Sequence, residues 1–285
     1  HPPRTGWRRR LMQGSSRASA AHGQRALDAL LACGPGGQAD YAGVADELFG
    51  VCAALDASAA LRRAFTDPTR EAFAKRELAH RLFGGKLSAA TVRLVSTLVE
   101  QRWSAERDLL DTVEGFAVQA LAAGAQARGR ADAVEDELFR FERIVAGTGS
   151  LRDAVTDRRA DPSARAQVVA SLLEGKAQPE TVRLARQAVL APRGRRFDRV
   201  IASYLSIIAT RRAQLSATVT TAIELDASQS ERLAAALTRI YGKPVHLKVV
   251  LDPQIVGGIR VQIGDEVVDG TVLRKLEGAR RHLGG

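Results

Sequence analysis

A stretch of 57 residues occurs twice in this chain. Residues 44–100 align with residues 134–190 without a gap, and 19 of the 57 aligned pairs are identical. Chance identity at this composition is about one in ten, so the repeat indicates a duplication. Where identity lapses, apolar residues keep a helical spacing in both copies: Val44, Leu48, Val51 and Leu55 in the first, and Val134, Leu138, Phe141 and Val145 in the second. The duplication therefore predicts two related helical bundles.

Composition limits the classes of protein that this chain can be. The formal charge is +10, but arginine outnumbers lysine 36 to 6, a bias that GC-rich coding produces without a functional demand. No run of about 18 apolar residues is present, so we expect no membrane-spanning helix. Cys33 and Cys52 fit neither a CxxC pair nor a zinc pattern, and we interpret them as reduced thiols.

The punctuation of the chain predicts four segments. Residues 1–24 are polar and rich in arginine, without periodicity, and we interpret them as a disordered basic tail. Met12 is the only methionine, which leaves open whether residues 1–11 belong to the native protein. Residues 25–130 form the first helical module, residues 131–213 the second, and residues 214–285 a small α/β domain. The predicted fold class is thus mainly α, with two related bundles followed by an α/β domain that contains a β-hairpin.

The second module has clear helix boundaries. Asp161 precedes Pro162 as an N-cap, Gly175 stands where a left-handed C-cap is expected, and Pro179 opens the next helix. Between the first two boundaries, we expect a buried helix face formed by Val168, Val169, Leu172 and Leu173. In each copy an acidic pair, Asp46-Glu47 or Asp136-Glu137, is interpreted as first-turn acids favoured by the helix dipole.

The last seventy residues change in character. β-Branched alternation predicts strands over 217–225, 245–251 and 259–263. Asp226, with Gln229 three residues later, predicts a capping box for a helix between the first two strands. Gly264-Asp265 predicts a two-residue hairpin turn to a returning strand at 266–268, and Thr271 caps a final helix.

At this C-terminal end the chain resembles a known family. The sequence from Val245 to Asp265, followed by Val268-Asp-Gly-Thr271, is similar to the signature of the delta subunit of bacterial F-type ATP synthases, whose mitochondrial counterpart is the oligomycin-sensitivity-conferring protein. The extra helical copy resembles the actinobacterial form. The signature residues are interpreted as fold determinants and not as catalytic groups: Asp252, Ile255, Gly257, Gly258, Gly264, Asp265, Asp269 and Gly270.

The resemblance implies a non-catalytic stator subunit. Family members link the catalytic alpha/beta head to the b subunits of the peripheral stalk, at the cytoplasmic face of the plasma membrane. It implies that a bundle groove accepts an N-terminal helix of the alpha subunit and that the C-terminal domain meets the b helices. We expect the second module to hold the alpha helix and the first to stiffen the stalk. No cofactor, metal, nucleic acid or direct membrane contact is implied.

Other interpretations of single features are weaker. Gly257-Gly258 lacks the Lys-Ser/Thr of a phosphate loop, and the five histidines are scattered. Trp103 and Phe116 are either interface anchors or core residues. Arg193, Arg195 and Arg196 form either a nucleic-acid patch or a face that is solvated or docks acidic helices. A basic helical adaptor for nucleic acid is the alternative function, although no aromatic residues are interleaved with the arginines.

Overall fold

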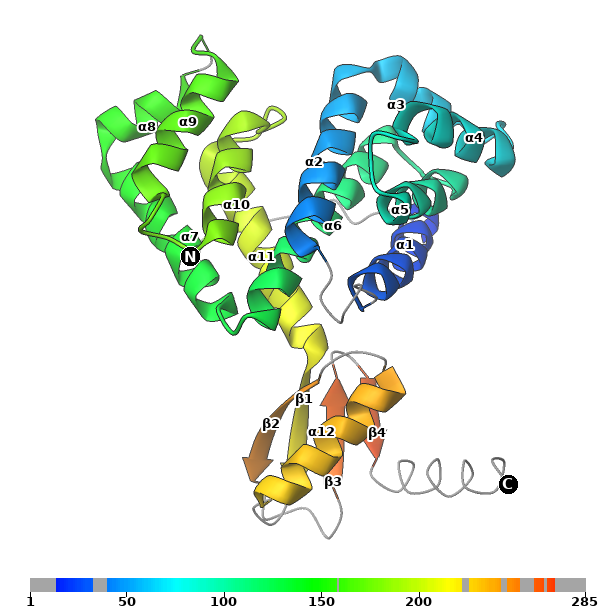
Figure 1. Cartoon of the computed structure of the whole chain (residues 1–285), viewed down its shortest axis with the longest axis vertical. Helices are drawn as coiled ribbons and strands as arrows, with labels where there is room; N and C mark the ends of the chain where they lie inside the picture. The colour runs from blue at the N-terminus through cyan, green and yellow to red at the C-terminus, as the bar shows by residue number, and fades with distance from the viewer. Residues whose placement is uncertain are drawn as a thin grey trace, which may run out of the picture. The chain divides into compact units, whose positions relative to one another are not determined.

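The described residues of this computed structural model form twelve helices and four strands (Figure 1). The structure describes residues 14–32, 40–157, 159–221, 226–241, 245–251, 259–263 and 266–269. The chain divides into two units, residues 1–207 and 208–285, and the division falls within the last helix of the second copy. The prediction of a mainly α fold with a small α/β part is confirmed.

The helices repeat as the sequence does. The first copy contains α1 (Gly14–Ala32), α2 (Tyr41–Ala57), α3 (Ala59–Thr66), α4 (Ala72–Phe83), α5 (Ala89–Glu100) and α6 (Glu106–Ala127). The second contains α7 (Ala131–Gly147), α8 (Gly149–Thr156), α9 (Pro162–Leu173), α10 (Pro179–Leu190) and α11 (Phe197–Leu215). Helices α2 to α5 recur as α7 to α10 with every boundary shifted by 90 residues.

Matching caps explain the matching boundaries. Asp161 accepts hydrogen bonds from the backbone N–H groups of Ser163 and Ala164, with Pro162 at the first helical position, as predicted. Gly85 and Gly175 follow α4 and α9 with φ of 74° and 72°, a conformation that a side chain would strain. The predicted buried face of α9 is only partly correct: Val169 is buried, but Val168 and Leu172 are exposed.

Helix α1 corrects the expectation of a disordered tail. Residues 14–24 form the first half of this helix, whereas residues 1–13 lie outside the described part. Ser16, Ser19, Gly23 and Leu27 are buried at spacings of three and four residues and make the packing stripe. A methyl group on Gly23 would lie 2.4 Å from Leu98 Cδ2, so a larger residue at this position would displace the Leu98 side chain of α5. The first half of the helix was missed because its buried residues, Ser16, Ser19 and Gly23, are small.

Helix α6 belongs to both copies. It packs against α1, α2 and α3, which precede it in the chain, and against α7 and α10, which follow it. Almost all of its residues from Leu109 to Ala125 are buried, rather than a single stripe. In the second copy, α6 takes the place beside α10 that α1 takes beside α5 in the first. Helix α6 therefore packs with helices on both sides of the expected boundary at 130/131.

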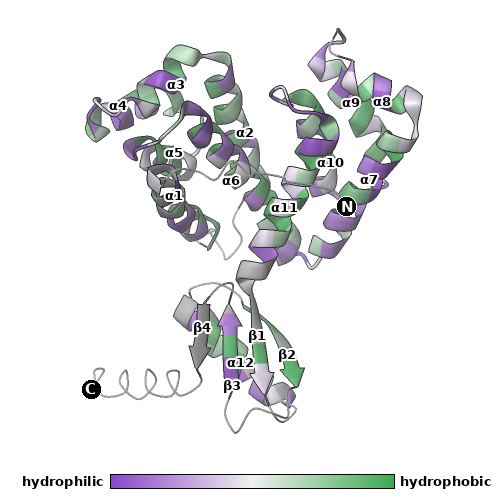
Figure 2. Ribbon diagram, turned by 180° about the vertical axis from the view of Figure 1, so that it is seen from behind, coloured by the Kyte–Doolittle hydropathy of each residue, from purple (hydrophilic) through white to green (hydrophobic). Residues whose placement is uncertain are grey.

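The C-terminal unit contains a four-stranded sheet with the order β2-β1-β3-β4. Strands β1 (Ser216–Thr221) and β2 (His246–Leu251) are parallel, joined through α12 (Ala227–Tyr241), whereas β3 (Ile259–Ile263) and β4 (Glu266–Asp269) form the predicted antiparallel hairpin. Val219, Leu237, Val245 and Val261 form the core between α12 and the sheet. The last three residues of β2 are exposed, although Figure 2 shows this strand as largely hydrophobic.

The predicted capping box is present at the start of α12. The Asp226 backbone N–H donates to Gln229 Oε1 at 3.0 Å, and the Gln229 backbone N–H donates to Asp226 Oδ1 at 2.7 Å. This reciprocal pair satisfies two backbone donors at the helix start. The predicted final helix from Thr271 lies outside the described residues.

Candidate functional site

A buried carboxylate joins the two copies. Glu114, in the middle of α6, has a side chain that is only 6% exposed. Its Oε1 accepts hydrogen bonds from Arg195 Nη2 at 2.6 Å and from Tyr204 Oη at 3.1 Å, and its Oε2 accepts from Arg193. Arg193 also donates to Asp111 Oδ1 at 2.8 Å. A buried carboxylate with this many donors ties α6 to the beginning of α11 and fixes how the copies meet.

The turn before α11 directs Arg193 and Arg195 toward Glu114. Arg193 has a φ of 51° and Gly194 a φ of 74°, so two successive residues adopt the left-handed conformation. This conformation is rare for arginine, and the bonds to Glu114 and Asp111 offset its cost. The sequence predicted a turn here but interpreted Arg193 and Arg195 as a solvated or docking surface. That interpretation was wrong for both residues, since they are directed to Glu114.

The environment of Glu114 perturbs two neighbouring acids. Burial, followed by the charge of Glu114, raises the pKa of Tyr204 well above its ordinary value. The same two causes raise the pKa of the Cys52 thiol, whose Sγ lies 3.8 Å from the Leu110 carbonyl oxygen. Cys52 is thus a neutral, buried thiol, and Cys33 lies outside the described residues. Neither the Tyr204 hydroxyl nor the Cys52 thiol has the lowered pKa of a nucleophile.

A cleft of about 720 Å³ lies between the copies. Its walls come from α2 on one side and from α9 and α10 on the other, and Glu114 of α6 is among its lining residues. Phe49, Ala53 and Leu190 supply apolar surface. Arg183 is paired with Asp46 at 3.3 Å across the cleft. Arg186, by contrast, is exposed and has no ion pair among the described residues, so the cleft presents an apolar surface with a cationic edge.

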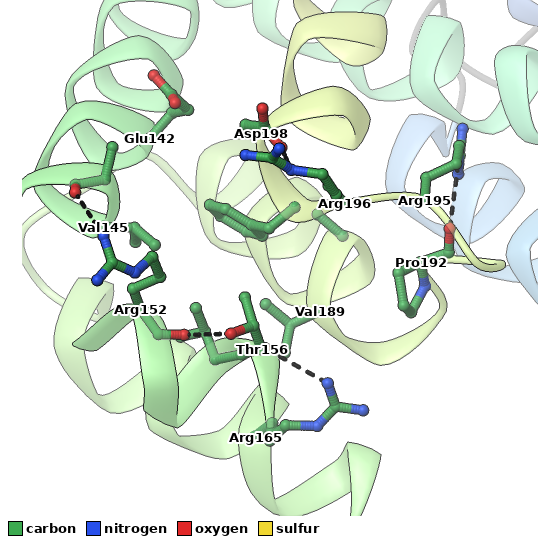
Figure 3. A pocket seen from close by; sticks show the side chains of 14 residues that line it. Glu142, Val145, Arg152, Thr156, Arg165, Val189, Pro192, Arg195, Arg196 and Asp198 are labelled. Atoms are coloured by element: carbon green, nitrogen blue, oxygen red, sulfur yellow. Dashed lines mark hydrogen bonds and ion pairs between the residues drawn. The ribbon is translucent and has the colours of Figure 1, made fainter. Parts of the chain in front are cut away.

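A smaller pocket of about 360 Å³ opens within the second copy, between α7, α8, α9, α10 and the start of α11 (Figure 3). Val145, Val155, Val189 and Phe197 form its apolar lining. Arg152, Arg165, Arg195 and Arg196 supply its basic groups, and Glu142 and Asp198 its acids. Arg165 also lines the larger cleft, so this residue borders both hollows.

The two copies share one further arrangement. Glu47 accepts from the backbone N–H of Ser88 at 2.6 Å and from the Ser88 hydroxyl at 2.8 Å. Its counterpart Glu137 accepts from the Gln178 backbone N–H at 2.8 Å and from Thr181 Oγ1 at 2.6 Å. Each glutamate therefore caps the start of α5 or α10. The interpretation as first-turn acids was wrong, because α2 and α7 begin at Tyr41 and Ala131.

Most of the predicted signature residues lie outside the described part of the chain. These are Asp252, Ile255, Gly257, Gly258, Gly264, Asp265 and Gly270. Asp269 is the last residue of β4 and is in register with Arg260 of β3. Trp103 and Phe116, which the sequence left as either interface anchors or core residues, are both buried in the core. Trp103 Nε1 donates a hydrogen bond to the Leu98 carbonyl oxygen at 2.8 Å.

Neither a metal centre nor a membrane span is found where the structure can be described. Within the described ranges no three or more His, Cys, Asp or Glu side chains gather to hold a metal ion. No helix among those residues combines the length and the apolar character needed to cross a membrane. The residues that organise the site, Glu114 above all, were missed in the sequence because one acid within an apolar helix stripe gives no local motif.

Comparison with known proteins agrees with this architecture. The family described as "ATP synthase delta (OSCP) subunit" matches residues 113–283, a range that starts within α6. An ATP synthase subunit delta of Kineococcus radiotolerans is 45% identical over 275 residues, covering 96% of this chain and 99% of the relative. The subunit delta of Streptomyces avermitilis is 46% identical over 270 residues, 95% and 98% of the two chains. That of Nocardia farcinica is 42% identical over 275 residues, 95% and 100% of the two chains.

Proposed function

This chain belongs to the ATP synthase delta (OSCP) subunit family, and from that premise we propose that it is a non-catalytic stator subunit of an F-type ATP synthase. It links the catalytic alpha/beta head to the b subunits of the peripheral stalk, so that the head does not turn with the rotor. In this role the chain lies at the cytoplasmic face of the plasma membrane and is held there only through the complex.

The cleft between the copies supports a helix-in-groove contact with the head. An α-helix with its side chains is about 10–12 Å wide, and an amphipathic helix buries its apolar face in a groove of this kind. Phe49, Ala53 and Leu190 offer the apolar surface, and Arg186 at the edge favours an acidic residue on the incoming helix. We assign this cleft to the N-terminal helix of the alpha subunit, on the α6–α10 face of the second copy.

A peptide with the sequence of that alpha-subunit helix tests the assignment directly. We expect the full chain to bind the peptide and Leu190→Asp to weaken binding by about tenfold or more, equivalent to about 1.4 kcal/mol. Phe139→Ser is the matched control, because Phe139 is also exposed and apolar but does not line the cleft. Equal binding by the Leu190 variant, or an equal loss in the control, would move the site elsewhere.

The C-terminal unit is assigned to the b subunits. The exposed apolar residues Val249, Val250 and Leu251 on the edge strand β2 support this assignment, because an edge strand offers both backbone groups and side chains to a partner. Val250→Asp is expected to reduce recruitment of a soluble b segment while leaving the alpha peptide bound. Loss of both partners in this variant would indicate a folding defect rather than a lost contact.

The first copy extends and stiffens this connection. This role of the first copy is supported by α6, which packs within both bundles and so connects them directly. The alternative, a basic adaptor for nucleic acid, has less support, because Arg193 and Arg195 are directed inward to Glu114. Tight, salt-dependent binding of DNA or RNA by a chain lacking residues 1–24 is the result that would revive it.

A further inference from the structure

The two copies differ at three equivalent core positions in the same region. The first copy has Leu55, Phe65 and Leu98, each no more than 1% exposed. Ninety residues later, the second copy has Val145, Val155 and Ala188, and all three line the 360 Å³ pocket. Each substitution removes carbon atoms from the interior, and the surrounding structure relaxes only partly around such a loss. The pocket is therefore space that larger side chains fill in the other copy.

The second copy also lacks the acidic residue that pairs with the equivalent arginine in the first copy. Arg62 of the first copy donates from Nη1 to the carbonyl oxygens of Leu55 and Asp56, and its Nε pairs with Glu106 Oε2 at 3.3 Å. The equivalent Arg152 keeps the carbonyl contact, donating to Ala146 O at 3.3 Å. It has no carboxylate within ion-pair distance among the described residues, because the residue 90 positions after Glu106 is Arg196.

Arg165 is a second guanidinium without a carboxylate partner. It is 8% exposed, and its Nη1 donates only a long hydrogen bond of 3.4 Å to the Val155 carbonyl. Its Nε has no hydrogen-bond partner, and no described carboxylate lies within 4.0 Å of it. A buried cation without an anionic partner is costly. The other two arginines of the pocket are already paired: Arg195 with Glu114 and Arg196 with Asp198.

The two differences coincide in one pocket and complement one kind of molecule. An apolar body would replace the missing side-chain carbons, and a carboxylate would replace the missing acid. The volume of about 360 Å³ is at the lower end of small-molecule sites. We infer that the pocket of the second copy is a binding site for a small monocarboxylic acid with a branched or aromatic hydrocarbon body, with its carboxylate at Arg152.

The copy-to-copy comparison also supplies the test. Val155→Phe with Ala188→Leu restores side chains of the first copy's size and fills the pocket without touching an arginine. We expect the full chain to bind 4-phenylbutyrate with a Kd below about 1 mM by titration calorimetry. The filled variant is expected to bind at least about tenfold more weakly, and the neutral 4-phenylbutanamide is expected to bind the unaltered chain about tenfold more weakly than the acid does.

Three results overturn the assignment. They are no saturable binding by the unaltered chain, equal binding by the filled variant, and equal binding of acid and amide. Circular dichroism and thermal unfolding of the filled variant establish that it is folded. If the double variant does not fold, Ala188→Leu alone serves in its place, and Arg152→Gln then tests the charge, since Arg152 is exposed and its loss leaves the core intact.

Discussion

Glu114 and Tyr204 are 90 residues apart in the chain, yet the Tyr204 hydroxyl donates to Glu114 Oε1 at 3.1 Å inside the protein. This contact joins the middle of the shared helix α6 to α11 of the second copy. Because Arg193 and Arg195 converge on the same carboxylate, the junction between the copies depends on one acidic side chain.

Glu114→Gln is predicted to destabilise the chain by about 3–5 kcal/mol. The change removes the carboxylate partner of Arg195 and one of the two partners of Arg193, whose side chain is only 5% exposed. Urea unfolding at pH 7 measures the loss. Glu106→Gln is the matched control, because Glu106 pairs with Arg62 but its side chain is 38% exposed, and we expect a cost below about 1 kcal/mol. Similar costs for both variants would contradict the central position of Glu114.

Tyr204→Phe is predicted to change how stability depends on alkaline pH. The folded pKa of Tyr204 lies well above its ordinary value of 10.0, so the folded state holds a proton that the unfolded state releases. The stability that the Tyr204 proton contributes is thus fully present below pH 10. It falls as the pH rises above 10, by up to about 1.4 kcal/mol per pH unit. The variant should show a shallower decline than the unaltered chain between pH 9.5 and 11. Parallel curves would mean that Tyr204 ionises normally.

The pocket predicts opposite responses at two equivalent positions. Leu98→Ala in the filled first copy should cost about 2–5 kcal/mol, because it opens a cavity. Ala188→Leu in the second copy should change stability by less than about 1.5 kcal/mol, because the pocket accepts the larger side chain. Ala185→Leu is the control: this buried alanine of α10 does not line the pocket, and overpacking should cost about 1–3 kcal/mol. A large cost for Ala188→Leu would mean that the pocket is not empty space.

The two glutamate caps should be equivalent in energy. Glu47→Ala and Glu137→Ala each remove the acceptor at the start of α5 or α10, and each is predicted to cost about 1 kcal/mol. Thermal unfolding of the two variants and of the double variant measures these costs. The sites lie in separate bundles, so the double variant should show their sum within about 0.5 kcal/mol. Strong non-additivity would show that the caps are coupled.

Helix α6 makes a prediction about fragments. A fragment of residues 106–285 retains Glu114 with its three donors and should unfold cooperatively in urea. A fragment of residues 131–285 lacks α6 and leaves Arg193, Arg195 and Tyr204 without Glu114. We expect this shorter fragment to lose near-ultraviolet circular dichroism and cooperative unfolding. A well-folded 131–285 fragment would mean that the second bundle does not need α6.

The sequence predicted what local patterns determine. The capping box of Asp226 and Gln229, the N-cap Asp161 and the strand at 259–263 all depend on residues a few positions apart. The sequence did not predict what depends on distant neighbours. Ser16, Ser19 and Gly23 become a buried stripe only because α5 and α6 lie close enough to need small residues. Glu114 becomes a junction only through groups about 80 to 90 residues further along.

Native mass spectrometry of the full chain, mixed with the alpha/beta/gamma head and a soluble b segment, tests the central claim most directly. The proposed stator function predicts one copy of the chain per head, and recruitment of b only when the chain is present. Leu190→Asp should reduce binding to the head, and Phe139→Ser should not. Binding of b to the head without the chain, or no binding of the chain to either partner, would contradict the proposed function.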